Sequence, residues 1–284
     1  METESKIMLP EDIQELELKD CHGLGSCLTE DVFLLLNIQR GGSSLTRCVV
    51  KDCEGMKCIL KSSSFKNERR PLVRNNSLCP ALQNLELLEL IKLPSLVELC
   101  EWESICGATL PCGTLSCLKS FCIHSCPSMT KLFTLRLLQH LQNLEVINIS
   151  SCYQLEEIVV DDQEECTTST STPSSSNSSS ILPKLRKLSL DDLPKLSNFY
   201  EGTIFCDSIE RVVIRYCPNL KRLPFFFPTV AGQLSPPPTL KVIEILELER
   251  EWWESLEWVD AGMQVVLQPF VRFHNRIIIV TPRI

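Results

Sequence analysis

The sequence predicts an α/β solenoid in which short parallel strands stack side by side. Three observations predict it: apolar residues recur in one frame, the frame returns about eight times, and the chain between copies varies in length. The clearest copy has its apolar residues at Leu141, Leu144, Ile147, Ile149, Cys152, Leu155 and Ile158. The same spacing returns at Leu182, Leu185, Leu188, Leu190, Leu193, Leu196 and Phe199. Such units stack because no single unit can bury its apolar face alone.

Each unit is predicted to form one strand, a turn and a return segment. The two apolar residues of the central LxL point into the core and their neighbours point outward, since side chains alternate along a strand. A Cys or Leu, which we name the anchor, then marks the end of the strand. The anchors are Cys21, Cys53, Leu93, Cys126, Cys152, Leu193, Cys217 and Leu248. This is the pattern of leucine-rich repeats, which form a horseshoe with a parallel β-sheet on the concave face and irregular or short helical return segments.

Composition and charge narrow the possible functions. Hydrophobic residues make up 44% of the 284 residues, which is enough for a continuous core. A net charge of -8 argues against a general nucleic-acid or anionic-membrane binder, because such proteins need surplus Lys and Arg to neutralise phosphate. The N-terminus lacks the apolar core of a signal peptide, and apolar runs fall short of the ~18 residues that a membrane span needs. We therefore expect a cytoplasmic or nucleocytoplasmic location. Because that environment is reducing, we expect most of the sixteen cysteines to be free thiols.

Breaks in the repeat frame predict the domain organisation. We expect residues 1–258 to form the solenoid and residues 259–284 to form a C-terminal cap and a divergent tail. Residues 161–180 are acidic and then rich in Ser and Thr, which predicts a mobile loop on the return side. Trp252, Trp253 and Trp258 follow the last anchor, and we expect them to cover the final coil, because indole rings suit an element with one dry and one wet side.

The sequence favours no catalytic, cofactor or metal site. The densest Cys/His cluster consists of Cys106, Cys112, Cys117, Cys122, His124 and Cys126. This cluster lacks the closely paired ligands of a structural zinc site. The glycines contain no GxxxxGK[ST] phosphate loop, and no Ser lies in a GxSxG elbow. We therefore predict a protein that is not an enzyme and has no cofactor.

Strand alternation predicts which side chains form the concave surface, where we expect a protein partner to bind. They are Glu15, Glu17, Lys19, Arg47, Lys51, Leu87, Glu89, Ile91, His124, Val146, Asn148, Lys187, Asp191, Arg211, Val213, Arg215 and Glu244. The apolar members, Leu87, Ile91, Val146 and Val213, are predicted to be exposed. Exposed apolar residues contribute to the centre of protein interfaces, although a single one on a surface is also ordinary.

Several phrases resemble a known family. The anchors Cys126, Cys217, Leu93 and Leu193 are each followed by proline, in the phrases CPSM, CPNL, LPSL and LPKL. Near the C-terminus the chain reads REWWESLEW over residues 250–258 and VLQPFVRF over residues 266–273. These phrases resemble the leucine-rich repeat region of plant intracellular NLR immune receptors of the coiled-coil type.

The resemblance implies a non-enzymatic recognition module in plant defence. In that family the region senses a pathogen effector or a guarded host protein and restrains a nucleotide-binding domain, whose phosphate loop this chain lacks. The implied partners are therefore proteins, including such a nucleotide-binding domain, with no nucleic acid and no membrane span. An alternative is a substrate adaptor of an F-box-type ubiquitin ligase, which also uses leucine-rich solenoids and needs an F-box before the repeats.

Overall fold

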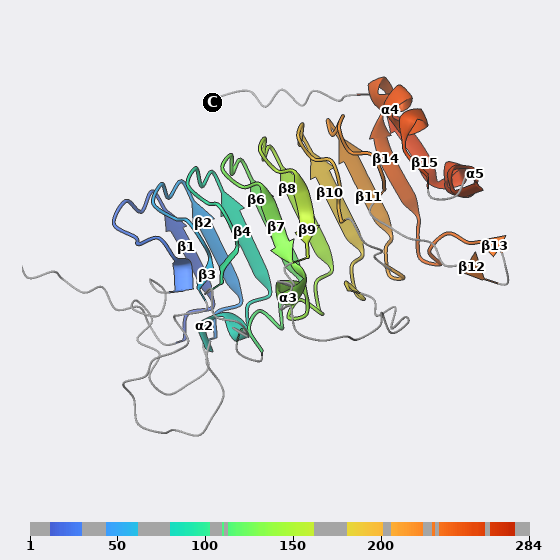
Figure 1. The fold of residues 1–284 in the computed structure, drawn as a ribbon. Coiled ribbons are helices and arrows are strands. Elements are labelled where there is room, and N and C mark those ends of the chain that lie inside the picture. The colour runs from blue at the N-terminus through green and yellow to red at the C-terminus, as the bar shows by residue number, and fades with distance from the viewer. Residues whose placement is uncertain are drawn as a thin grey trace, which may run out of the picture.

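The computed structural model is a leucine-rich repeat solenoid, which confirms the predicted fold class (Figure 1). The structure describes residues 12–29, 44–61, 80–102, 110, 113–161, 181–200, 206–223, 229–230, 233–258 and 262–275. The loop predicted at 161–180 lies outside these ranges except for Asp161, and so does the tail from residue 276. None of the helices in the described ranges has the length and apolar composition needed to cross a lipid bilayer.

One parallel sheet runs through the described residues and contains nine strands in chain order. They are β1 (Glu15–Lys19), β2 (Arg47–Lys51), β4 (Leu87–Ile91), β6 (Ser120–His124), β8 (Val146–Ser150), β10 (Lys187–Asp191), β11 (Arg211–Arg215), β14 (Val242–Leu246) and β15 (Val271–His274). The pairing keeps equivalent residues opposite each other, so that Leu88 faces Phe121 and Phe121 faces Ile147. The inner residues of the repeat frame therefore form continuous rows across the solenoid.

The return side of the coil is less regular. Short parallel pairs form between β3 (Leu60–Lys61) and β5 (Cys100–Glu101), and between β7 (Lys131–Thr134) and β9 (Glu157–Val160). The other elements are α2 (Pro80–Gln83), α3 (Leu135–Leu138), the antiparallel pair β12 (Thr229–Val230) and β13 (Gln233–Leu234), the 3-10 turns η2 (Glu247–Glu249) and η3 (Gln268–Phe270), α4 (Arg250–Ser255) and α5 (Gly262–Leu267). These segments vary while the strands do not, as the uneven repeat spacing predicts.

The apolar slots of the frame build one continuous core. All seven slots of the copy from Leu141 to Ile158 are at most 1% exposed. The core extends from Leu16 in the first strand to Val271 in the last. Because burying one leucine side chain contributes about 1.5–3 kcal/mol, the stacked rows supply most of the driving force for this fold.

Cysteine suits the anchor slot because its thiol is small, apolar and still a weak donor. The anchor thiols donate to the carbonyl two residues earlier, over Sγ···O distances of 3.2 to 3.6 Å. The anchors that make this contact are Cys21, Cys53, Cys126, Cys152 and Cys217. All cysteines within the described residues are free thiols, as predicted.

In seven of the eight units the residue before the anchor has a left-handed backbone, with φ between 51° and 57°. These residues are Asp20, Asp52, Lys92, Ser125, Ser151, Asp192 and Tyr216. The left-handed region is unusual for residues other than glycine, and aspartate tolerates it better than most. Here the N–H of the left-handed residue still donates to the next unit, as from Asp52 to Ile91 at 3.0 Å. The turn thus extends the sheet by one hydrogen bond while it redirects the chain into the core.

The C-terminal end differs from the prediction. Leu248, predicted as the eighth anchor, is 66% exposed, because η2 and α4 begin directly after β14. Trp253 is buried instead, at 1% exposure, with its ring 5.1 Å from that of Trp258. Trp252 donates from Nε1 to the Leu220 carbonyl of the preceding coil at 2.9 Å.

The tryptophans therefore complete the return side of the eighth coil, and they do not end the stack. The sheet continues beyond residue 258, where we predicted the solenoid to stop, because β15 pairs with β14. Figure 1 shows α4 and α5 beside these last two strands. The ninth strand was missed because its sequence, VRFH, carries no LxxLxL frame.

Candidate functional site

All predicted partner-surface residues lie on strands of the nine-stranded sheet, on the side that faces away from the core. They are Glu15, Glu17 and Lys19 on β1, Arg47 and Lys51 on β2, Leu87, Glu89 and Ile91 on β4, His124 on β6, Val146 and Asn148 on β8, Lys187 and Asp191 on β10, Arg211, Val213 and Arg215 on β11, and Glu244 on β14. We name this surface the concave face. Register pairing brings these residues into three rows that cross the solenoid.

The prediction that Val213 is an exposed contact is wrong. Its side chain is only 6% exposed. Arg211 and Arg215 flank it on β11, and Glu244 lies opposite it on β14. Glu244 pairs with Arg211 over 2.6 Å and with Arg215 over 3.9 Å, so these three side chains cover the valine. Leu87, Ile91 and Val146 are half-buried and remain accessible.

The concave face has three parts that differ in charge. The N-terminal part, on β1, β2 and β4, is balanced between the anions Glu15, Glu17 and Glu89 and the cations Lys19, Arg47 and Lys51. The central part, on β6 and β8, consists of Ser120, Cys122, His124, Val146, Asn148 and Ser150. The C-terminal part, on β10, β11, β14 and β15, carries the cations Lys187, Arg211, Arg215 and Arg272 and the anions Asp191 and Glu244. Positive charge is therefore in excess only at the C-terminal part.

The central part is polar, and its one thiol, Cys122, is not activated. His124 Nδ1 lies 2.8 Å from Ser150 Oγ on the neighbouring strand. Partial burial raises the pKa of the Cys122 thiol above its ordinary value. A thiol with a raised pKa is mostly protonated at neutral pH and reacts slowly. These side chains can donate and accept hydrogen bonds to a partner, which fits binding better than covalent chemistry.

A second charged feature, not identified from the sequence, runs along the edge of the sheet where the strands begin. It is a row of alternating charges formed by Glu86, Lys119, Glu145, Arg186, Glu210 and Lys241, each directly before a strand. We name this row the charge ladder. Its signal was present in the sequence as a sign that alternates from one unit to the next.

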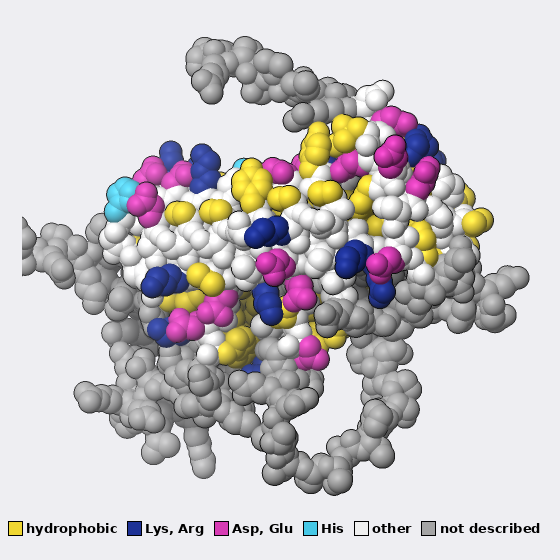
Figure 2. Space-filling view, turned by 45° about the horizontal axis from the view of Figure 1, so that its top comes forward, with side chains coloured by type: hydrophobic (Ala, Val, Ile, Leu, Met, Phe, Trp, Pro, Cys, Tyr) yellow, Lys and Arg dark blue, Asp and Glu magenta, His cyan; other side chains and the backbone are white. Residues whose placement is uncertain are grey.

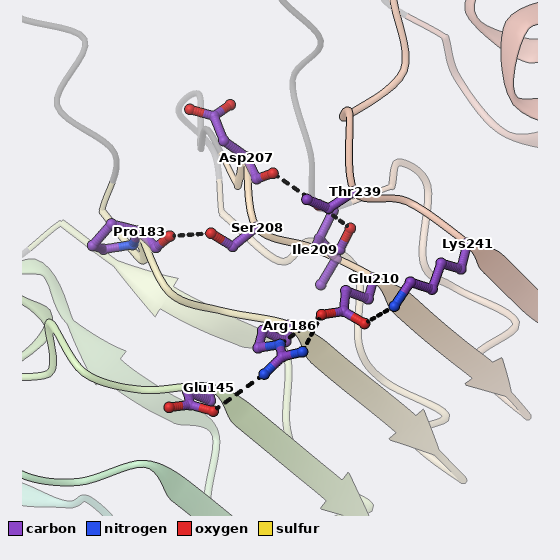
Figure 3. A network of polar contacts seen from close by, with 9 residues as sticks. All are labelled: Glu145, Pro183, Arg186, Asp207, Ser208, Ile209, Glu210, Thr239 and Lys241. Carbon is purple, nitrogen blue, oxygen red and sulfur yellow. Dashed lines mark hydrogen bonds and ion pairs between the residues drawn. The ribbon is translucent and has the colours of Figure 1, made fainter.

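Neighbouring members of the charge ladder form ion pairs. Lys119 Nζ lies 2.9 Å from Glu86 Oε1. Figure 3 shows Arg186 reaching Glu145 on one side, at 4.0 Å, and Glu210 on the other, at 2.5 Å. Hydrogen bonds from Lys241 and Arg186 hold the pKa of the Glu210 carboxyl below its ordinary value. The ladder thus neutralises its own charges.

The opposite edge, where the strands end, carries a row of apolar side chains from the third unit onward. Figure 2 shows hydrophobic side chains in a row along it. From the third to the seventh unit the residues that directly follow the anchors are Pro94, Pro127, Tyr153, Pro194 and Pro218, whereas His22 and Glu54 occupy this position in the first two units. Backbone carbonyls of this row accept hydrogen bonds from the next unit, from Ser128 Oγ to Pro94 and from Asn219 Nδ2 to Pro194 at 2.6 Å. The proline phrases of the sequence therefore belong to the turns that join neighbouring coils.

Potential metal ligands do not converge anywhere in the part of the chain that the structure describes. No group of three or more His, Cys, Asp or Glu there could hold a metal ion. Cys106 and Cys112 of the sequence cluster lie outside the described ranges. A described cavity beneath the sheet is lined by apolar core residues, among them Leu88, Phe121 and Phe133. Such a cavity offers no polar group to orient a substrate.

The fold and the concave face together define a leucine-rich repeat protein whose strands present side chains for recognition. The family model described as "Plant disease resistance protein RPS2-like, leucine-rich repeats" matches residues 99–245. The chain belongs to this family. The resemblance to the leucine-rich repeat region of plant NLR-type disease resistance proteins is thereby confirmed.

Individual relatives agree with the family match. "Disease resistance protein At4g27190" of Arabidopsis thaliana is 27% identical over 255 residues, which cover 87% of this chain and 23% of the relative. "Probable disease resistance protein At5g47260" of the same plant is 33% identical over 159 residues, which cover 56% of this chain and 15% of the relative. The chain thus spans about a quarter or less of the length of these relatives.

Proposed function

We propose that this chain is the sensing region of a plant immune receptor. Its concave face would bind a protein, either a pathogen effector or a guarded host protein, and would also contact a nucleotide-binding domain that this chain does not contain. The observation that carries the proposal is the contrast between the two sides of the strands. The inner slots are apolar in every unit, whereas the middle concave position changes through Glu17, Val49, Glu89, Cys122, Asn148, Ser189, Val213 and Glu244.

The proposed mechanism is a shift between two states of the receptor. A ligand changes such an equilibrium only by the difference in its affinity for the two states. An effector that binds where the nucleotide-binding domain rests would favour the released state. A hundredfold preference for that state corresponds to about 2.7 kcal/mol. No bond-making centre is needed.

The rigidity of the concave face supports this mechanism. Its strands are held by in-register pairing and by the hydrogen bonds of the left-handed residues. A preformed surface loses little conformational entropy on binding. Both partners could therefore use the same face without a large change in backbone.

A pull-down with a purified nucleotide-binding domain of the NLR family tests the proposal. The variant Asn148→Arg places a long charged side chain in the middle of the uncharged central part, so we expect it to abolish capture of a partner lying across this face. Thr130→Arg introduces the same side chain on an exposed return segment and is the matched control. Wild-type capture that Asn148→Arg leaves unchanged would contradict the use of the concave face.

The relatives reported above are named as disease resistance proteins, and this favours the immune-receptor proposal over the F-box adaptor. No contact among the described residues specifically supports an adaptor. We therefore propose a single function for the chain.

A further inference from the structure

The C-terminal part of the concave face carries cations that its own anions do not balance. Lys187 on β10 lies directly opposite Arg211 on β11. Like charges in opposite positions repel each other and destabilise a sheet. Asp191 lies opposite Arg215 on the same pair of strands, so the repulsion is concentrated on Lys187 and Arg211.

One carboxylate forms ion pairs with two guanidinium groups in the C-terminal part of the concave face. Glu244 pairs through Oε1 with Arg211 and through Oε2 with Arg215, and its side chain is only 12% exposed. The Arg211 side chain is 50% exposed. Each guanidinium carries five N–H donors, whereas Glu244 has two oxygens. The two arginines therefore present more donors than this carboxylate can accept.

Arg272 extends the positive charge to the last strand. It lies opposite Glu244 in register, and its Nη1 donates to the carbonyls of Pro269 and Val271 at 2.9 Å each. These bonds fix its guanidinium at the end of the sheet. We name Lys187, Arg211, Arg215 and Arg272 the basic cluster.

The N-terminal part of the same face provides an internal comparison. Arg47 on β2 pairs with Glu89 on β4 at 3.3 Å, and its side chain is 46% exposed. Its neighbour in register on β1 is Glu15, an anion, whereas the corresponding neighbour of Arg211 is the cation Lys187. The same kind of ion pair thus lies in balanced surroundings at one end and in cationic surroundings at the other.

We propose that the basic cluster docks an acidic segment, rich in Asp and Glu, of the protein that binds the concave face. The inference rests on the proposed function and specifies the chemistry of its partner. Arginine forks match carboxylates in bidentate geometry, so several carboxylates in one segment complement several guanidinium groups. The chain's net charge of -8 gives it no general attraction for polyanions, so the docking depends on the basic cluster itself, and a peptide segment follows from the protein partner of the proposed function.

Fluorescence anisotropy with the full chain and a labelled Glu/Asp-rich peptide tests the docking. A peptide with Gln and Asn at the acidic positions is the probe control. We expect the acidic peptide to bind, the amide peptide not to bind, and added salt to weaken binding because it screens exposed charges. The double variant R211E/R272E should weaken binding by about tenfold or more, since two favourable charge contacts become repulsive.

The double variant K184E/K195E changes the net charge by the same amount at two exposed lysines outside the strands of the concave face and is the matched control. It should alter the affinity by less than about threefold, because it acts only through long-range charge. Circular dichroism of both variants verifies that they fold. Equal losses in the two variants, equal binding of the amide peptide, or equally tight binding of a single-stranded oligonucleotide would each overturn the inference.

The two proposals fail in different ways. If Asn148→Arg abolishes capture of the nucleotide-binding domain but R211E/R272E leaves peptide binding unchanged, the acidic docking is wrong and the proposed function stands. If Asn148→Arg leaves the capture unchanged, the proposed function fails, whatever the peptide does.

Discussion

The two sides of each strand differ in how strictly the fold restricts them. On β10 the inner residues Leu188 and Leu190 are fully buried, while Lys187, Ser189 and Asp191 face outward. Every unit repeats the apolar inner side, but the outer side is acidic, basic, polar or apolar in different units. Packing therefore determines one side, and the other is available for recognition. A leucine-rich solenoid can change its ligand without changing its backbone.

The largest expected effect comes from removing the buried indole at the end of the solenoid. The Trp253 side chain is only 1% exposed, and its ring packs against that of Trp258. Trp253→Ala should therefore leave a cavity and destabilise the protein by about 3–5 kcal/mol. Thermal unfolding followed by circular dichroism measures it. Val265→Ala, at an exposed position of α5, is the control and should change stability by less than about 0.5 kcal/mol. A Trp253 variant as stable as the wild type would show that the tryptophans are not part of the core.

The next effect contrasts the two sides of one strand directly. Leu190→Ala should cost about 2–5 kcal/mol, since the side chain is fully buried between neighbouring units. Ser189→Ala, its neighbour on the concave face, should stay within about 0.5 kcal/mol. Chemical denaturation of both variants measures the contrast. Similar losses in the two would contradict the distinction between a restricted inner side and a permissive outer side.

This contrast explains how much of the molecule could be predicted. The buried slots of the copy from Leu141 to Ile158 followed from spacing alone, because burial forces the same residue types at the same intervals. The concave positions were also placed correctly on their strands, since alternation is a local property. The burial of Val213 was not predicted, because it depends on ion pairs that Arg211 and Arg215 form with Glu244 of the next unit. Cross-strand contacts of this kind require the register.

The end of the solenoid was harder for a related reason. Leu248 continues the leucine spacing, but the strand ends at Leu246 and η2 turns Leu248 toward solvent. β15 pairs with β14 over Val271–His274 although its sequence has no repeat frame. Edge pairing needs only a free strand edge and an extended chain, so it leaves little signature in sequence. The charge ladder, in contrast, could have been read from the alternating signs before each strand.

Alkaline pH tests how dry the inner side is. Burial raises the pKa of the Cys48 thiol to about 12 from its ordinary value of 9.0. The folded state therefore keeps a proton that the unfolded chain loses between these values. The contribution of this thiol is complete below pH 9.0 and declines by about 1.4 kcal/mol per pH unit as the pH rises toward 12.

The variant Cys48→Ala should accordingly show a shallower loss of stability than the wild type across this alkaline range. Urea denaturation at a series of pH values measures both slopes. Cys122→Ala is the control from the concave face, where the thiol is only partly buried. If the wild type and Cys48→Ala lose stability in parallel, water reaches the inner rows and the thiol is not held in a dry core.

The smallest expected effect lies in the charge ladder, which is outside the core but as regular as the inner side. Glu210→Gln keeps a hydrogen-bonding side chain and removes the charge that Arg186 and Lys241 share. Exposed ion pairs contribute little, so the change in melting temperature should be smaller than in Trp253→Ala or Leu190→Ala and should shrink at high salt. Because the folded pKa of Glu210 is lowered, its contribution is present above the ordinary carboxyl pKa and is lost as the pH falls through the lowered value. The variant and the wild type should therefore differ at neutral pH and low salt and converge in acid. A loss as large as that of Leu190→Ala, or one that salt does not reduce, would mean that the ladder acts through packing and that its alternating charges are not what stabilises this edge.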